Sequence, residues 1–236
     1  MKTNLHLPKI VSLFALVLIQ SLSGVALAVE IDHLLQEKAI KTTIMEESHK
    51  EILSELYIKL SVGVRTKRST LLIEWMKVHN LSISKTYACY NAGNFQTNKD
   101  PNYISQLESV GFLSKCNYVR KDGNTMYKSF GVHSVLFPLK DSNHTIVNFY
   151  AIGIRINRAD FLNQEGIYPC FPKEQTTKLF IVPTILDAAT MLESKVLKPT
   201  EFVIALFDGK LMPQHEEAIG TLKHLKEIIW LETTKI

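Results

Sequence analysis

The side chains that could bind a metal ion or act in catalysis are few in this chain of 236 residues. Two aspartates follow apolar runs: Asp187 opens a helical pattern, and Asp208 comes directly after a second run. Asp208 could give Mg²⁺ one oxygen ligand, but such sites gather several oxygens, so alone it would bind the ion weakly. For Asp187 two interpretations are open. Capping of a helix N-terminus, where acids are stabilising, is favoured over catalysis.

The histidines and cysteines show no spacing typical of a metal site or a nucleophile. His215, Glu216 and Glu217 are consecutive in a predicted helix and therefore do not share a face. The cysteines are far apart in the sequence: Cys89, Cys116 and Cys170. Their odd number is poor evidence for a disulfide framework. We therefore assign no catalytic residue and no metal ligand, and we expect no small-molecule cofactor.

Basic side chains are the best candidates for a nucleic-acid interface. The net charge of +4 permits a nucleic-acid partner without requiring one. The cluster at residues 65–68 has two interpretations, a solvated surface loop, which is the commoner role, and a contact with phosphates. The predicted nucleic-acid-binding residues are Arg65, Lys67, Arg68, Lys121, Arg155 and Arg158.

The elements around the two aspartates are predicted by hydrophobic periodicity. An apolar run at residues 178–182, a turn at 183–184 and a helical pattern beyond it predict the first half of a βαβ unit. A second apolar run, at residues 201–207, supplies the parallel strand. Parallel strands joined by a helix place chemistry at their carboxyl ends. Those ends carry Pro183, Thr184, Asp208 and Gly209.

The region before this unit is predicted to be helical first and then rich in strands. Residues 42–113 read as a bundle of short helices, one of them running from Ser82 through Tyr90. A hairpin is predicted at residues 118–127. A second pair of strands is predicted at 135–139 and 145–156, with Pro138 implying an edge position because proline cannot donate to a ladder.

After these strands, residues 157–177 are predicted to form a loop. Beyond the βαβ unit, a helix is expected from Met212 to about Leu225, followed by a strand at 228–231. The predicted fold class is α+β.

We predict four segments along the chain. Residues 1–28 form a leader, residues 29–116 a helical subdomain, residues 117–177 a β-rich subdomain, and residues 178–236 a partial βαβα unit.

The leader has the layout of a signal peptide. Lys2 and Lys9 precede an uncharged apolar stretch that ends Ala26-Leu27-Ala28, with small residues where a leader is cleaved. As a membrane span it is marginal, at about 19 residues with polar interruptions. A buried helix and residues acquired by an altered start are the alternatives. Export or membrane attachment thus stays open, and a membrane partner is expected only if the leader is retained.

The order of these parts resembles the bacterial-type DNA primases, more closely the primase-like proteins of mobile elements and phages. Residues 71–81 are similar to the helical segment that precedes the family's polymerase core. Residues 135–141, V-L-F-P-L-K-D, are similar to its V-M-F-P-I-x-D strand and turn, and residues 161–163, F-L-N, to its Y-L-N element. Residues 178–231 resemble the first part of a TOPRIM fold, the nucleotidyl-transferase and topoisomerase module.

The resemblance implies chemistry for which this sequence lacks the residues. The family holds Mg²⁺ with a glutamate after the first TOPRIM strand and an Asp-x-Asp pair after a later one. Pro183 stands at the glutamate position, and Glu232-Thr233-Thr234 stands at the Asp-x-Asp position. Asp208 does not replace that pair, because it follows the second strand. Residues 130–133, F-G-V-H, replace the family's basic F-R-x-R.

We therefore predict a degenerate, C-terminally truncated primase-like TOPRIM protein without catalytic activity. Single-stranded DNA is the expected partner, in DNA replication or a mobile element, and the resemblance implies a cytoplasmic location. One alternative is an exported or membrane-tethered binding protein of unknown ligand. Another is a decayed fragment without function.

Overall fold

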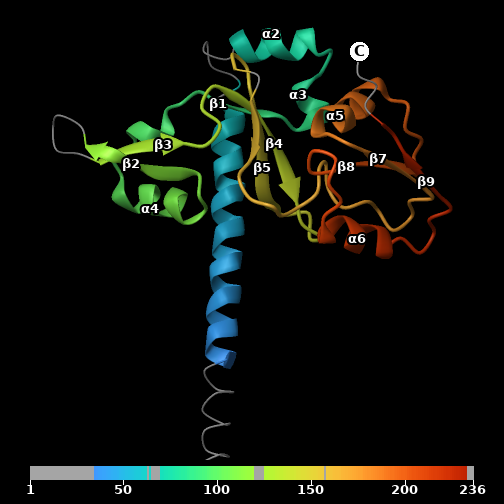
Figure 1. Ribbon diagram of the computed structural model, residues 1–236, viewed down its shortest axis with the longest axis horizontal. Helices are drawn as coiled ribbons and strands as arrows, with labels where there is room; N and C mark the ends of the chain where they lie inside the picture. Colours follow the sequence, from blue (N-terminus) through green and yellow to red (C-terminus); the bar gives the residue numbers. More distant parts are fainter. Residues whose placement is uncertain (1–34, 63, 65–69, 120–124, 157, 233–236) are drawn as a thin grey trace, which may run out of the picture. The chain divides into compact units, whose positions relative to one another are not determined.

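The computed structural model describes residues 35–62, 64, 70–119, 125–156 and 158–232 (Figure 1). The chain divides into two compact units, Met1–Ser48 and His49–Ile236. In the first unit, residues 35–48 are helical and all exposed. No helix among the described residues is both long and apolar enough to cross a membrane. The predicted leader, residues 1–28, lies outside the described residues.

The second unit begins with helices, as the sequence predicts, but the first of them is not short, because the helical residues run from 35 through 62 without a break. Residues 49–62 are helical and are followed by α2 (Thr70–Val78), α3 (Ile83–Thr86), the 3-10 helix η2 (Phe95–Thr97) and α4 (Pro101–Ser109). The helix predicted from Ser82 through Tyr90 is wrong in its second half. It stops at Thr86, because Tyr87 takes a left-handed conformation (φ 56°) and strand β1 (Cys89–Asn91) follows. All three residues of β1 are buried, so pairing with a distant strand overrides the local helical pattern.

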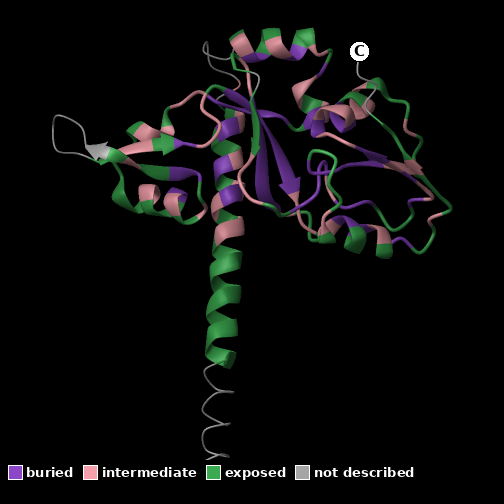
Figure 2. Cartoon of the chain, viewed as in Figure 1, coloured by how far each residue is buried: buried purple, intermediate pink, exposed green. Residues whose placement is uncertain are grey.

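Strand β1 belongs to an antiparallel sheet in the order β1-β4-β5-β6. Its other strands are β4 (Ser134–Lys140), β5 (Ile146–Gly153) and β6 (Ala159–Phe161). Strands β4 and β5 are apolar and buried along nearly their whole length, so they form the centre of this part of the fold (Figure 2). The paired strands predicted around residues 140–144 are confirmed, whereas β6 lies in a region predicted to be loop.

Pro138 does not mark an edge strand, since β4 lies between β1 and β5. Proline still donates no ladder hydrogen bond, but this constrains only the position of Pro138 and not the whole strand. Strand β1 pairs with residues 134–136 and ends before it reaches Pro138. On the other side, Pro138 faces Phe149, whose carbonyl accepts from the Leu162 N–H on the β6 side (2.9 Å). Pro138 therefore sits where no ladder hydrogen bond is required of it.

A separate hairpin is formed by β2 (Leu113–Val119) and β3 (Thr125–Ser129), as predicted. Strand β2 crosses the boundary predicted between residues 116 and 117, and the predicted domain limits stay predictions.

The βαβ unit predicted from residue 178 onward is present. It comprises β7 (Lys178–Val182), α5 (Ile185–Ser194), β8 (Glu201–Ala205), α6 (Pro213–Gly220) and β9 (Glu227–Trp230). The three strands are parallel in the order β8-β7-β9. Helix α6 ends at Gly220, earlier than the predicted residue 225.

One hydrophobic cluster joins these parts of the second unit. Leu72 of α2, Tyr90 of β1, Phe137 of β4, Val182 of β7 and Ala188 of α5 all belong to it, and each is at most 5% exposed. Residues far apart in the sequence therefore share one core.

Candidate functional site

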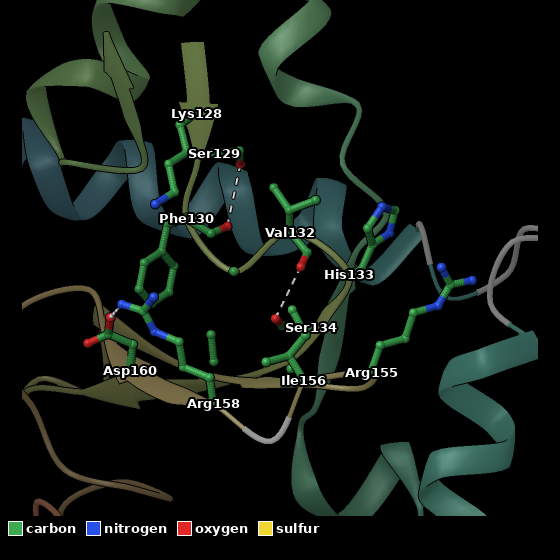
Figure 3. A pocket seen from close by; sticks show the side chains of 13 residues that line it. Lys128, Ser129, Phe130, Val132, His133, Ser134, Arg155, Ile156, Arg158 and Asp160 are labelled. Atoms are coloured by element: carbon green, nitrogen blue, oxygen red, sulfur yellow. Dashed lines mark hydrogen bonds and ion pairs between the residues drawn. The ribbon is translucent and has the colours of Figure 1, made fainter. Parts of the chain in front are cut away.

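A pocket of about 600 Å³ lies where β3, β4 and β5 end, and both described arginines of the predicted interface line it (Figure 3). Arg155 and Arg158 follow β5 and extend along opposite sides of the pocket. Lys128 at the end of β3 and His133 before β4 also line it. The structure thus brings together basic residues that are about 30 positions apart in the sequence.

The wall of the pocket formed by residues 129–133 is held by Asn91, whose side chain is fully buried. Its Nδ2 donates to Ser129 Oγ (3.0 Å) and to the Phe130 carbonyl (2.7 Å). Its Oδ1 accepts from the Gly93 N–H (2.8 Å), and its carbonyl accepts from the His133 N–H (2.8 Å). A buried amide with every group bonded fixes its partners precisely. We did not identify Asn91 from the sequence, because its partners are about 40 residues away.

The turn at residues 130–133 requires a glycine. Gly131 has φ +57°, and a Cβ there would lie 2.9 Å from the Ala151 Cβ. His133 also has positive φ, 54°, a conformation uncommon for residues other than glycine. The F-G-V-H segment at residues 130–133 is therefore a tight turn against β5.

The rim of the pocket carries an excess of positive charge. Arg158 Nη2 lies 3.3 Å from Asp160 Oδ2, but the arginine side chain is still 73% exposed. The Arg155 guanidinium forms no hydrogen bond or ion pair with any residue that the structure describes. Burial raises the pKa of the Tyr90 hydroxyl, and the nearby charge of Arg155 acts against this increase. Arg155 is thus available to an anionic ligand.

The other predicted contacts with nucleic acid cannot be placed. Arg65, Lys67, Arg68 and Lys121 lie outside the described residues. Lys128 and His133 were missed by the sequence analysis. Both could have been found from their place beside or within the F-G-V-H segment. That segment was considered only because it lacks the two arginines of F-R-x-R.

The carboxyl ends of β7 and β8 do come together, as the parallel arrangement predicts. The Gly209 N–H donates to the Pro183 carbonyl (2.8 Å). Asp208 is exposed, with φ 48°, and its Oδ1 accepts from the Tyr150 hydroxyl (3.3 Å). The pKa of the Tyr150 hydroxyl is raised, mainly by burial and in addition by the negative charge of Asp208. Within the described part of the chain, no three His, Cys, Asp or Glu side chains lie close enough to hold a metal ion.

Asp187 has the capping role that the sequence analysis favoured. Thr184 Oγ1 accepts from the Asp187 N–H (3.2 Å), and Asp187 Oδ2 accepts from the Thr184 N–H (3.2 Å). This reciprocal pair is a capping box and begins helix α5. Asp187 therefore positions the helix at the carboxyl end of β7.

His215 is a fully buried structural residue. Its Nδ1 accepts from the Met212 N–H (2.9 Å), so Nε2 carries the proton and donates to the Ala205 carbonyl (3.0 Å). Burial lowers the pKa of the ring. His215 thus joins the start of α6 to the end of β8.

A polar cluster joins α3 to α5. Lys85 Nζ lies 2.7 Å from Glu193 Oε1, and Ser82 donates to Oε2 from its N–H (2.8 Å) and its hydroxyl (2.6 Å). The hydrogen bond from Lys85, followed by those from Ser82, lowers the pKa of Glu193 to about 2. This cluster fixes the helical region against the βαβ unit.

Similarity to known proteins is found in comparisons of the fold and not in comparisons of the sequence. No protein-family model and no curated sequence matches the chain. The solved DnaG primase catalytic domain bound to ssDNA superposes with a TM-score of 0.63 at 11% identity, over 80% of this chain and 62% of that one. A DNA primase domain from Pseudomonas aeruginosa gives 0.62 at 11% identity, over 77% and 60%. The chain has the fold of a DnaG primase catalytic domain.

Further structures agree with this assignment. The zinc-binding and RNA polymerase domains of the Aquifex aeolicus primase give a TM-score of 0.61 at 12% identity, over 80% of this chain and 48% of that one. The chain spans about three fifths of the length of the first two primase domains. The resemblance inferred from the V-L-F-P-L-K-D and βαβ segments is therefore confirmed at the level of the fold.

Proposed function

We propose that this primase-fold protein binds single-stranded nucleic acid and does not polymerise nucleotides. The observation that carries the proposal is the pocket bordered by Arg155 and Arg158 at the end of the central sheet. Arginine is well suited to phosphate oxygens because its fork of donors matches their geometry. The DNA-bound primase domain with the same fold supports this choice of ligand.

The lack of polymerase activity is proposed from the carboxyl ends of β7 and β8. The residues there do not fit a Mg²⁺ site, which needs several oxygen ligands. Pro183 has no side-chain oxygen, and its carbonyl already accepts from Gly209. Two carboxylates lie at these ends. Asp208 accepts from the Tyr150 hydroxyl, and Asp187 is engaged with Thr184 in the capping box of α5. We place the function in DNA replication, with a mobile element as its proposed setting.

Primer synthesis on a single-stranded template tests the first half of the proposal. With ribonucleotides and either Mg²⁺ or Mn²⁺, we expect no template-dependent oligonucleotide. Such a product, formed by the purified chain and abolished by omitting the template, would contradict the proposal.

Binding of a labelled single-stranded oligonucleotide tests the second half. Affinity should fall as salt rises, because phosphate contacts release counterions. Arg155→Gln should weaken binding. It should also reduce the slope of log affinity against log salt concentration by about one. Lys99→Gln, which removes an exposed charge outside the pocket, is the matched control. Equal binding by the two variants, or binding that does not respond to salt, would argue against this interface.

A further inference from the structure

The pocket has an apolar interior as well as a basic rim. Phe130, Val132, Ala151 and Ile156 contribute carbon surface to it. Ile156 is 74% exposed, so its side chain is accessible from the pocket. In Figure 3 the ring of Phe130 points toward Arg158, on the side of the pocket opposite Arg155. An aromatic side chain, half-buried and packed near Phe112 (ring centroids 6.3 Å apart), and a branched aliphatic side chain thus border the same cavity.

The charged groups are confined to the edge of this surface. Three basic side chains, Lys128, Arg155 and Arg158, line the pocket together with a single acid, Asp160. The acid is paired with Arg158, and within the described part of the chain neither Arg155 nor Lys128 has a charged partner. Arg155 lies on the side opposite Arg158. Its guanidinium can therefore bind an anion at the rim while the interior of the pocket holds an apolar group.

We infer that the pocket binds one unstacked nucleotide of a single strand, an inference that rests on the proposed function. The base would lie on Phe130 and Ile156, and the phosphate would be held by Arg155. Bases stack on aromatic side chains regardless of sequence, and splayed bases are the usual targets in single strands. A phosphate ion alone would gain no favourable contact from the apolar side chains of the interior, whereas a base would.

The dimensions and the chemistry agree with this ligand. A volume of about 600 Å³ is within the usual range of small-ligand pockets, about 300–1,000 Å³. The binding requires no metal ion, because the arginine side chains supply the positive charge. This separates the pocket from the carboxyl ends of β7 and β8, where the residues do not fit a Mg²⁺ site.

Calorimetry in the presence of EDTA tests the inference with three probes: dAMP, deoxyribose 5-phosphate and inorganic phosphate. The base should improve binding of dAMP over the other two by roughly tenfold, the size of one stacking interaction. Val132→Phe, which fills the pocket at a half-buried position, should abolish this preference. Phe130→Leu should reduce it several-fold, and Lys99→Gln should leave it unchanged. Circular dichroism of each variant establishes that it is folded.

The outcomes separate the inference from the function on which it rests. Equal binding of the three probes, with strand binding still dependent on Arg155, would overturn the nucleotide pocket and leave the proposed function standing. A dAMP preference that Val132→Phe does not change would also overturn it, because the base would then bind elsewhere. Binding of dAMP without any binding of single strands would overturn the proposed function and, with it, the assignment of the pocket to a nucleotide of a strand.

Discussion

Glu193 illustrates how the fold changes the chemistry of a single residue. On a free helix it would be an ordinary surface carboxylate near the end of α5. In the folded chain it accepts two hydrogen bonds from Ser82 and forms an ion pair with Lys85. All of these favour the charged form, so the pKa falls from its ordinary value of 4.5 to about 2. The charged form of Glu193 therefore stabilises the contact between α3 and α5.

This shift predicts how stability depends on pH. Because the pKa is lower in the folded state, the contribution of Glu193 is complete above its unfolded pKa and is lost as the pH falls through about 2. Glu193→Gln should lower the free energy of unfolding at pH 7, and the difference from wild type should shrink between about pH 5 and pH 2. Urea denaturation across this range measures it. Glu217→Gln, at an exposed position further along α6, should follow the wild-type curve. A difference that stays constant down to pH 2 would contradict the ion-pair assignment.

At the scale of elements, helix α5 owes its start to two side chains close in sequence. Thr184 and Asp187 bond to each other's backbone and satisfy N–H groups that a helix end leaves open. Interactions between residues this close in sequence can be predicted from the sequence. For this reason the position of Asp187 was enough to assign it a capping role. Strand β7 and helix α5 then follow from a local apolar run and a local cap.

Loss of this cap should destabilise the protein. Thr184→Ala should lower the free energy of unfolding by about 1 kcal/mol, the usual value of such a cap. Thr190→Ala is the matched control, because Thr190 lies exposed within the same helix and its hydroxyl donates to the Leu186 carbonyl (2.9 Å). Alanine is at least as favourable in a helix interior, so this control should be neutral or slightly stabilising. Equal destabilisation by both variants would show that the cap has no special role.

At the scale of the molecule, the second unit is held by contacts between distant segments. The hydrophobic cluster includes residues of α2, β1, β4, β7, α5 and β8. The Tyr168 hydroxyl donates to the Thr86 carbonyl (2.9 Å) in the buried interior. The helical region and the βαβ unit therefore share this core, although each also has a buried cluster of its own, around Phe112 in the first and around Leu179 in the second.

The shared core predicts a single cooperative transition for residues 49–236. The two tryptophans report on different regions, Trp75 on α2 and Trp230 on β9. In Trp75→Phe and Trp230→Phe, the fluorescence of the remaining tryptophan should follow the near-ultraviolet circular dichroism of the same variant during urea denaturation. Fluorescence and dichroism midpoints that differ within either variant would show that the two regions unfold separately.

Much of the fold could be predicted from the sequence because it depends on short-range patterns. The strand at residues 178–182, the cap at Thr184 and Asp187, and the strands around residues 140–144 each follow from side chains within a few positions of one another. Hydrophobic periodicity and capping are local properties, so no knowledge of the partner strands was needed. The order of these segments was also enough to indicate the primase fold.

Only the tertiary structure decided which distant residues form the pocket. Strand β1 exists because β4 lies beside it, and this pairing places Asn91 against Phe130 and His133. The pairing of β4 with β5 then brings Arg155 to the same cavity. Unlike the β4–β5 hairpin, the pairing of β1 with β4 leaves little trace in local periodicity, since its free energy comes from burial and hydrogen bonds between segments more than 40 residues apart. The sequence by itself determined the parts of the scaffold, and strand pairing decided where a ligand could bind.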